Sequence, residues 1–332
     1  MPHSIVILDG YTLNPGDLDW QPLRQLQGIH SLTIHDRTPD DQIVPRTRSH
    51  AIALTNKTPL RKTHLDQLPD LKYIGVLATG TNIIDLATAR DRRVTVTNVP
   101  GYSTDSVAQH TIALLLELAS QVGAHDQAVQ RGDWAAGPDF SFTVAPLIEL
   151  SGKTLGIVGM GSIGKRVATI AAALGMRIVA AQQRSMADVS LPGIDIQWLP
   201  HDELFAQADA VTLHCPLTEQ TQGIVNAQRL ASMKRTAYLI NTGRGQLIDE
   251  AALADALHAG RIAGAGLDVL SVEPPAKRAD TARLASPLIG APRCIITPHI
   301  AWATLQARRR LMSLAVDNVR AFLAGQPTHV VN

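Results

Sequence analysis

TLGIVGMGSIG, residues 154–164, joins a short apolar run to a G-x-G-x-x-G loop. An alanine-rich helical pattern follows at once, over residues 162–174. In this setting Gly159 allows a tight turn, Gly161 lets a pyrophosphate approach the backbone, and Gly164 lets the helix pack closely on the strand. Glycine-rich turns are common, so the motif alone is weak. A strand before it and a helix after it favour a dinucleotide-binding unit over a plain turn.

The start of this helix supplies the second part of the predicted phosphate site. Ser162 and Ile163 occupy its first turn, where backbone N–H groups lack partners within the helix. These groups and the positive end of the helix dipole suit a phosphate. We therefore expect Ser162 and Ile163 to join the three glycines in binding the cofactor.

The next predicted strand, residues 177–181, lacks the acidic residue that accepts from the ribose 2′-OH in NAD sites. Gln182, Arg184 and Ser185 lie in the segment that follows, and the first acid is Asp188. Glutamine does not repel a 2′-phosphate, and Arg184 can bind one. The pattern favours NADP, or the use of both cofactors, over NAD alone. The alternative is that Arg184 is a solvated loop residue and NAD binds through its diphosphate.

Short apolar runs alternate with helical patterns on both sides of this loop. Before it, predicted strands span 5–8, 29–34, 51–54, 73–77 and 94–97; after it, they span 177–181, 210–214, 237–241, 263–269 and 295–297. Predicted helices include 60–68, 85–90, 250–259 and 305–323. Such alternation predicts an α/β protein with parallel sheets covered on both faces.

A different pattern separates the two series. A long helix is predicted from Thr104 to near Gly132. Residues 133–151 then contain Trp134, Phe140 and Phe142 without clean periodicity. This segment either packs on another subunit or forms a surface loop that buries its own aromatic side chains.

The composition excludes several classes of protein. The 332 residues suggest about two domains. A hydrophobic share of 45% and a charged share of 18% are ordinary for a globular protein, which argues against disorder. The net charge of +1 makes nucleic acids and anionic membranes poor default partners. No apolar run of ~18 residues predicts a membrane-spanning helix.

The chain start and the cysteines point to a cytoplasmic location. The first residues lack the basic stretch and apolar core of a signal peptide. Cys215 and Cys294 have neither zinc-site nor redox spacing, and two cysteines are no disulfide framework for a chain of this length. We expect a protein of the reducing cytoplasm, without a bound metal.

Three polar residues follow strand-like runs and are candidates for chemistry. Arg244 comes after 239–243, Glu273 after 267–270, and His299 after 295–298. In an open α/β sheet, ligands bind at the carboxyl ends of the strands. An arginine fork suits a carboxylate, a histidine transfers protons near neutral pH, and a carboxylate stabilises imidazolium. Taken singly, a surface ion pair, a turn residue and a loop-packing residue are the simpler interpretations, and spacing alone does not join the three.

A resemblance joins them. The chain resembles the D-isomer-specific 2-hydroxyacid dehydrogenases in stretches that span almost its whole length in the family's order. The matching stretches are 76–82, 98–100, 106–109, 159–164, 213–218, 241–245, 266–269, 273–274 and 298–302. Within the family, LATGTN at 77–82 and HIAWA at 299–303 are most similar to glycerate dehydrogenases and hydroxypyruvate or glyoxylate reductases.

The resemblance implies a role for each matching residue. Arg244 would bind the substrate carboxylate, His299 would transfer the proton, and Glu273 would orient His299. Backbone N–H groups of Thr79 and Gly80 would bind the carboxylate as well, and Trp302 would border the substrate, although core packing is its simpler role. The remaining expected cofactor contacts are Asp268, to the nicotinamide carboxamide, and Thr104, Pro216 and Thr242.

The resemblance also implies an architecture. Residues 1–100 with 299–332 would form a flavodoxin-like substrate-binding domain, and 101–298 a Rossmann domain. Both would be doubly wound parallel sheets with an active-site cleft between them, and the protein would be a homodimer. The segment 276–292 is longer than is usual in the family and could alter access to the site.

The expected reaction is hydride transfer between NAD(P)H and a small 2-oxo acid, with hydroxypyruvate and glyoxylate as the expected substrates. Two alternatives stay open. One is a dinucleotide-sensing binding protein, since the family resembles transcriptional corepressors that retain much of the site. The other is a different reaction of the family, such as formate or phosphite oxidation.

Overall fold

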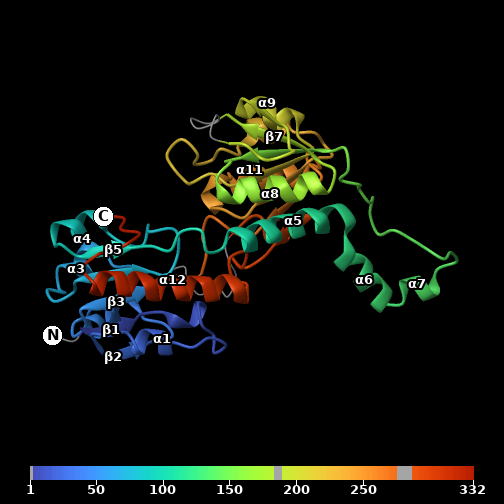
Figure 1. The fold of residues 1–332 in the computed structure, drawn as a ribbon. Coiled ribbons are helices and arrows are strands. Elements are labelled where there is room, and N and C mark those ends of the chain that lie inside the picture. Colours follow the sequence, from blue (N-terminus) through green and yellow to red (C-terminus); the bar gives the residue numbers. More distant parts are fainter. Residues whose placement is uncertain (1–2, 183–188, 275–285) are drawn as a thin grey trace. The chain divides into compact units, whose positions relative to one another are not determined.

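The computed structural model describes residues 3–182, 189–274 and 286–332, which form two compact units (Figure 1). One unit comprises 1–103 and 303–332, and the other comprises 104–302. The chain therefore crosses between units three and four residues after the predicted boundaries at 100 and 298. Residues 300 and 301 stay with the second unit because their backbone N–H groups donate to Asp268.

The first unit is built on a five-stranded parallel sheet with the strand order β2-β1-β3-β4-β5. The strands are β1 (His3–Ile7), β2 (Ile29–Ile34), β3 (Ile52–Thr55), β4 (Tyr73–Val76) and β5 (Thr95–Thr97). Its helices are α1 (Gln21–Arg24), α2 (Ile43–Thr47), α3 (Lys62–Leu65), α4 (Leu86–Asp91) and α12 (Leu305–Leu323), with 3-10 turns at Gly10–Thr12 and Asp40–Gln42. Every residue of β3 and β4 is buried, as expected for parallel strands covered on both faces.

The last helix of the chain completes this first unit. The α12 helix packs against β4, and the ring of Phe322 lies 4.7 Å from that of Tyr73. Beyond the helix, the side chain of Asn332 accepts from the N–H of Val96 and donates to the carbonyl of Val94. Figure 1 shows α12 in red among the blue N-terminal strands.

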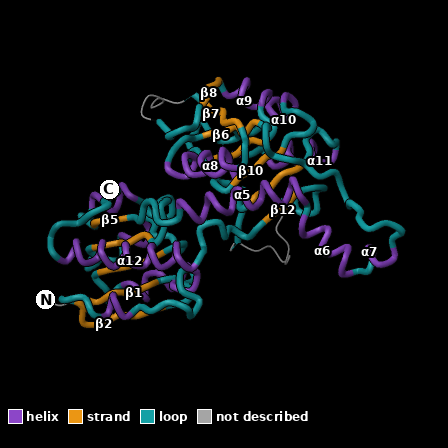
Figure 2. Tube along the Cα trace, turned by 45° about the vertical axis from the view of Figure 1, so that its right-hand side comes forward, coloured by secondary structure: helices purple, strands orange, loops and turns teal. Residues whose placement is uncertain are grey.

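The second unit contains a seven-stranded parallel sheet with the order β12-β11-β10-β9-β6-β7-β8 (Figure 2). The strands are β6 (Thr154–Val158), β7 (Arg177–Ala181), β8 (Ile196–Leu199), β9 (Ala210–Leu213), β10 (Tyr238–Asn241), β11 (Gly264–Leu267) and β12 (Cys294–Ile296). The two sheets confirm the predicted α/β class with two doubly wound parallel sheets. The edge strand β8 was not predicted; only Leu199 of its four residues is buried.

Helices cover both faces of this sheet. They are α5 (Thr104–Ser120), α8 (Ser162–Ala173), α9 (His201–Gln207), α10 (Ala227–Ser232) and α11 (Glu250–His258), with a 3-10 turn at Gly245–Leu247. Two glycines of β11 let α5 approach the sheet. A Cβ on Gly266 would lie 3.0 Å from Cβ of Leu114, and a Cβ on Gly264 would lie 3.1 Å from Cδ2 of Leu118.

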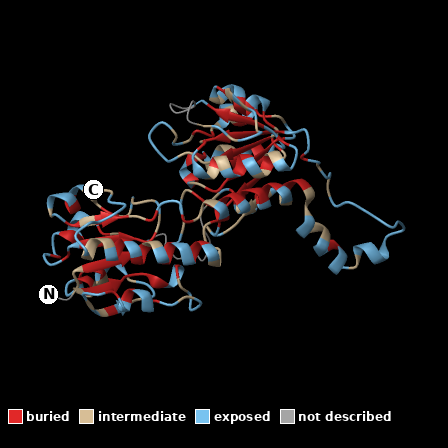
Figure 3. Ribbon diagram, viewed as in Figure 1, coloured by how far each residue is buried: buried red, intermediate tan, exposed pale blue. Residues whose placement is uncertain are grey.

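The long helix predicted from Thr104 is two helices in the structure. They are α5 and α6 (Val122–Gln130), and the break between them lies at Gln121, whose φ of 52° is left-handed. The short helix α7 (Asp133–Ala136) follows. Figure 3 shows the segment beyond this break largely in the colour of exposed residues. Trp134 is 51% exposed and Phe140 is 90% exposed. Of the two predicted alternatives, a loop that buries its own aromatic side chains is therefore wrong.

Across residues 3–182, 189–274 and 286–332, no helix combines the length and the apolarity needed to cross a bilayer.

Candidate active site

Three neighbouring strands present the predicted catalytic set. Arg244 follows β10, Glu273 follows β11 and His299 follows β12. These strands run parallel and are hydrogen-bonded in this order. Their carboxyl ends therefore share one edge of the sheet, which is where ligands bind in doubly wound folds.

His299 and Glu273 form the closest pair of ionisable groups at this edge. Nδ1 of His299 lies 2.7 Å from Oε2 of Glu273, and both side chains are partly exposed. The other carboxylate oxygen accepts from the N–H of Leu270 at 3.3 Å. A carboxylate on Nδ1 fixes the ring orientation and leaves Nε2 for proton exchange with a ligand.

The Arg244 loop lies against the loop that leads to Glu273. A Cβ on Gly245 would lie 1.9 Å from the carbonyl carbon of Leu270, so only glycine fits there. Nε2 of Gln246 donates to the carbonyl of Ser271 at 2.8 Å. The structure thus brings the loops of Arg244 and Glu273 into direct contact.

The Arg244 guanidinium is exposed and is available to a ligand. Its Nη1 donates to the carbonyl of Gly243 at 2.8 Å, and its own carbonyl accepts from Nδ2 of Asn241. Within the described part of the chain, no carboxylate forms an ion pair with it. An arginine in this state can bind a carboxylate through its two-pronged fork.

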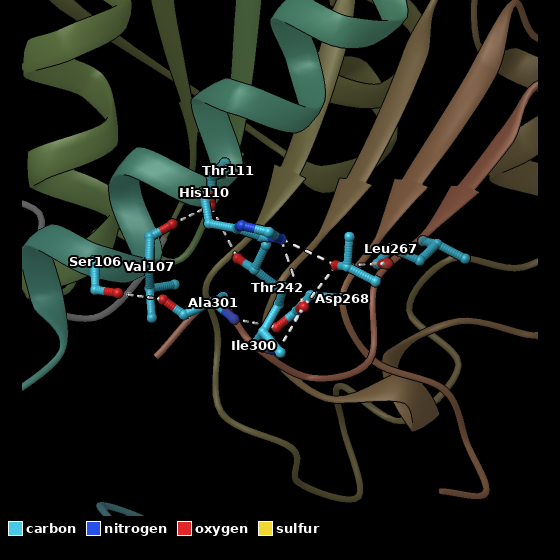
Figure 4. Close-up of polar contacts among 10 residues, drawn as sticks. Ser106, Val107, His110, Thr111, Thr242, Leu267, Asp268, Ile300 and Ala301 are labelled. Atoms are coloured by element: carbon cyan, nitrogen blue, oxygen red, sulfur yellow. Dashed lines mark hydrogen bonds and ion pairs between the residues drawn. The ribbon is translucent and has the colours of Figure 1, made fainter. Parts of the chain in front are cut away.

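The backbone of His299 is held in a conformation that costs energy. Its φ of 55° is left-handed, a region that L-residues other than glycine rarely occupy. Its N–H donates to the carbonyl of Asp268 at 2.9 Å. The Asp268 carboxylate, which is completely buried, accepts from the N–H of Ile300 and of Ala301, each at 2.8 Å (Figure 4). Asp268 therefore anchors the loop that carries His299, and its predicted contact to nicotinamide stays a prediction.

The glycine loop has the shape that a dinucleotide requires. Gly159 has a φ of 101°, and a Cβ there would lie 2.6 Å from the backbone nitrogen of Cys215. A Cβ on Gly164 would lie 2.1 Å from the carbonyl oxygen of Gly159. Gly161, by contrast, has no atom within 4 Å of its Cβ position, which leaves open space in front of α8. The helix begins at Ser162, so this space faces free N–H groups, and the residues fit a bound diphosphate.

The other predicted cofactor residues occupy strand and helix ends in the same unit. Gln182 follows β7 and is exposed, and Pro216 is an exposed residue shortly after β9. Thr104 is the first residue of α5. Thr242 is buried after β10, and its hydroxyl is 2.9 Å from that of Thr111. Arg184 lies outside the described residues, as does most of the long segment 276–292.

Sequence reasoning overlooked His214 and Cys215, which follow β9 and lie against the glycine loop. The sheet order reverses between β6 and β9, so residues after both strands flank the same point. Burial lowers the pKa of His214 to about 3 and raises that of Cys215 to about 11. Both side chains are therefore neutral at pH 7 and add no charge beside a bound diphosphate. Both residues lie in the stretch 213–218, which resembles the family and could have pointed to them. The resemblance assigned a role only to Pro216 in that stretch.

Two of the predicted substrate residues belong to the first unit. Thr79 and Gly80 follow β4, and the loop is fixed on both sides. Oγ1 of Thr79 donates to the carbonyl of Val99 at 3.0 Å, and Nδ2 of Asn98 donates to the carbonyl of Thr79 at 2.7 Å. Trp302, the last residue of the second unit, is half-buried. The substrate contacts of all three stay predictions.

Among the described residues, no group of three or more His, Cys, Asp or Glu side chains could hold a metal ion.

Comparison with known protein families agrees with this geometry. A family model described as "D-isomer specific 2-hydroxyacid dehydrogenase, NAD binding domain" matches residues 112–301, more than half of the chain. The chain belongs to this family. The predicted family is thereby confirmed, and so is the predicted enzyme class, an NAD(P)-dependent 2-hydroxyacid dehydrogenase.

Two relatives match over almost the full length of this chain. A hydroxypyruvate reductase of Blautia hydrogenotrophica is 44% identical, over 99% of each chain. A glycerate dehydrogenase of Methylorubrum extorquens is 38% identical, over 100% of this chain and 99% of its own. Among solved structures, the NADPH-dependent glyoxylate/hydroxypyruvate reductase of Sinorhizobium meliloti, in complex with NADP and malonate, matches with a TM-score of 0.81 and 27% identity, over 100% of this chain and 97% of that one.

Proposed function

We propose that this dehydrogenase reduces hydroxypyruvate and glyoxylate to D-glycerate and glycolate with NAD(P)H. The observation that carries the proposal is the 2.7 Å contact between Nδ1 of His299 and Oε2 of Glu273, on loops that join the Arg244 loop at one sheet edge. Full-length relatives named hydroxypyruvate reductase and glycerate dehydrogenase support this choice of substrate.

Each residue of the set has one task in this reaction. Arg244 binds the substrate carboxylate and polarises the keto oxygen. His299 donates a proton from Nε2 to that oxygen as it becomes a hydroxyl, and Glu273 stabilises the imidazolium and holds its orientation. The bound dinucleotide supplies the hydride. Backbone N–H groups of Thr79 and Gly80 are proposed as further partners of the substrate carboxylate.

The test is a substrate panel measured with both cofactors by the change in nicotinamide absorbance. Hydroxypyruvate, glyoxylate and pyruvate are offered with NADH and NADPH, and formate and phosphite with the oxidised forms. We expect the highest kcat/KM for hydroxypyruvate or glyoxylate. Turnover of formate or phosphite alone would reassign the reaction, and dinucleotide binding without any turnover would favour the sensing protein.

We propose NADP as the preferred cofactor, because exposed Gln182 stands where an acidic residue would repel a 2′-phosphate. Replacing Gln182 with Asp is expected to shift the ratio of kcat/KM for NADPH over NADH by roughly 10-fold or more towards NADH, since a like charge beside the phosphate costs about 1.4 kcal/mol or more. Gln197→Asp, on the neighbouring edge strand β8, is the control and should leave the ratio within about twofold. An unchanged ratio in Gln182→Asp would remove this residue from cofactor choice.

We further propose a cytoplasmic homodimer. The exposed aromatic side chains of Trp134 and Phe140 support the association of two copies, because aromatic residues are enriched at protein interfaces. Cys215 and Cys294 are free thiols, which suits a reducing compartment.

A further inference from the structure

One face of α5 contacts the loop that carries His299 (Figure 4). Ser106 and His110 lie one helical turn apart on this face. Oγ of Ser106 donates to the carbonyl of Ala301 at 2.5 Å. Nε2 of His110 lies 2.9 Å from Oγ1 of Thr297 and 3.5 Å from Oδ1 of Asp268. The helix therefore contacts the loop both before and after His299.

The direction of these hydrogen bonds follows from counting hydrogens. Oγ1 of Thr297 lies 2.6 Å from Oδ1 of Asp268, the length of a hydroxyl donating to a carboxylate. A hydroxyl has a single hydrogen, so the same oxygen accepts from Nε2 of His110. His110 therefore carries its hydrogen on Nε2, and the neutral ring is sufficient for this.

The chain of donors ends on the group that holds His299 in place. Asp268 binds the N–H groups of Ile300 and Ala301 through its carboxylate, and the N–H of His299 through its carbonyl. A left-handed conformation at a residue other than glycine costs of order 1 kcal/mol or more and persists only when its surroundings fix it. The side chain of His110 is 21% exposed and that of Asp268 is not exposed at all, so the hydrogen bonds lead from a partly exposed imidazole to a buried carboxylate.

We propose that His110 is a positioning residue for the reaction: through Thr297 and Asp268 it keeps the His299 backbone in the conformation that directs the imidazole towards Glu273. This inference rests on the proposed reductase function. The same helix also reaches the Arg244 loop, because the hydroxyl of Thr111 lies 2.9 Å from that of Thr242. The first turns of α5 thus support two of the three loops of the site.

The test compares His110→Gln with His110→Leu. The amide nitrogen of Gln takes the position of the imidazole Nε2 and keeps the donor, whereas Leu fills the space without one. We expect His110→Leu to lower kcat for hydroxypyruvate by about 10–100-fold, while the Kd for NADPH stays within about twofold. His110→Gln should stay within about threefold of the wild type. Equal losses in both variants, or unchanged kcat in His110→Leu, would overturn the proposal.

A second pair of variants removes the next group in the chain. Thr297→Val deletes the hydroxyl and Thr297→Ser keeps it, and this pair also serves if His110→Leu does not fold. Thr297→Val is expected to lose as much activity as His110→Leu, and the double variant no more than either, because the residues act through one hydrogen-bond chain. Fully additive losses would contradict the coupling.

Hydrogen exchange of the amides of Ile300 and Ala301 separates this inference from the proposed function. These amides donate to Asp268, so faster exchange in His110→Leu, but not in His110→Gln, supports positioning even if the wild type reduces none of the 2-oxo acids. In that case the proposed function alone fails. Equal exchange in all three proteins would overturn the role of His110, whatever the substrate.

Discussion

His299 is the residue on which the proposed chemistry depends most directly. Among the predicted catalytic residues that the structure describes, only His299 has one ring nitrogen bound and a second one left for substrate. Its Nδ1 lies 2.7 Å from the carboxylate of Glu273, and Nε2 remains. Its left-handed backbone is a local cost that the surrounding hydrogen bonds offset. Backbone strain of this kind is typical of functional positions, where the orientation of a side chain matters more than local stability.

His299→Ala is expected to lower kcat for hydroxypyruvate by roughly 10²–10⁴, the usual contribution of general acid–base catalysis. Folding should be retained, because Asp268 binds the backbone of this loop and not the imidazole. Steady-state kinetics and circular dichroism provide the measurement. His258→Ala, at the exposed end of α11, is the matched control and should keep full activity. A His299→Ala enzyme with normal kcat would refute the assignment.

At the scale of the element, close packing of loops decides where Arg244 lies. Gly245→Ala would place a methyl group within 2 Å of the Leu270 backbone, so the two loops must separate. We expect the free energy of unfolding to fall by about 1–3 kcal/mol, as in other overpacked sites, and kcat/KM to fall at least about tenfold. Denaturant unfolding and kinetics measure both.

The neighbouring Gly243 supplies the control for the stability measurement. A Cβ at this position has its nearest atoms at 3.5 Å, an ordinary contact distance. Gly243→Ala should therefore change the free energy of unfolding by less than about 0.5 kcal/mol. Similar losses of stability in both variants would show that the contact of Gly245 with Leu270 is unimportant.

The ion pair that links α12 to the N-terminal loop of the first unit should weaken in acid. Arg308 donates to both carboxylate oxygens of Asp17, each at 2.6 Å, and this hydrogen bonding holds the pKa of Asp17 below its usual value. The folded state thus favours the ionised carboxylate. Its stabilising effect is present at neutral pH and is lost as the pH falls below about 4, through the folded pKa.

Asp17→Asn is accordingly expected to lower the denaturant midpoint at pH 7, and this effect should shrink as the pH falls below about 4. Asp255→Asn, on the exposed side of α11, should leave the midpoint unchanged at both pH values. A midpoint difference that grew in acid would contradict the direction of the pKa shift.

Periodic elements were predictable from the sequence, and elements that depend on neighbours were not. Residues 305–323 were predicted with the bounds that the structure has, because their apolar residues recur at helical spacing. The strand 29–34 was also predicted with its observed bounds. The break at Gln121 was missed, since nothing in the residue type announces a positive φ. Residues after strand ends were found as candidates, but Asp268 was assigned only a ligand contact, because its partners 300 and 301 are defined by the fold.

At the scale of the whole molecule, the exposed aromatic segment after α5 predicts self-association. Replacing Trp134 and Phe140 together with Ser is expected to convert a dimer into a monomer, because a stable interface depends on a few buried aromatic anchors. Light scattering at micromolar concentration measures the particle mass. Leu174→Ser, an exposed apolar residue at the end of α8, should leave the dimer intact. A monomeric wild type would disprove the proposal.

The division of the first unit between the two ends of the chain has a consequence for biosynthesis. Its sheet is made from residues up to 103, whereas α12, which covers β4, belongs to the segment that begins 200 residues later. At about 5–20 residues per second, the ribosome needs roughly 10–40 s to bridge that interval. The surface of β4 that α12 covers therefore stays uncovered until residues 305–323 have been made. Over that time the second unit can fold, so the first unit, whose sheet is made earlier, is completed after it.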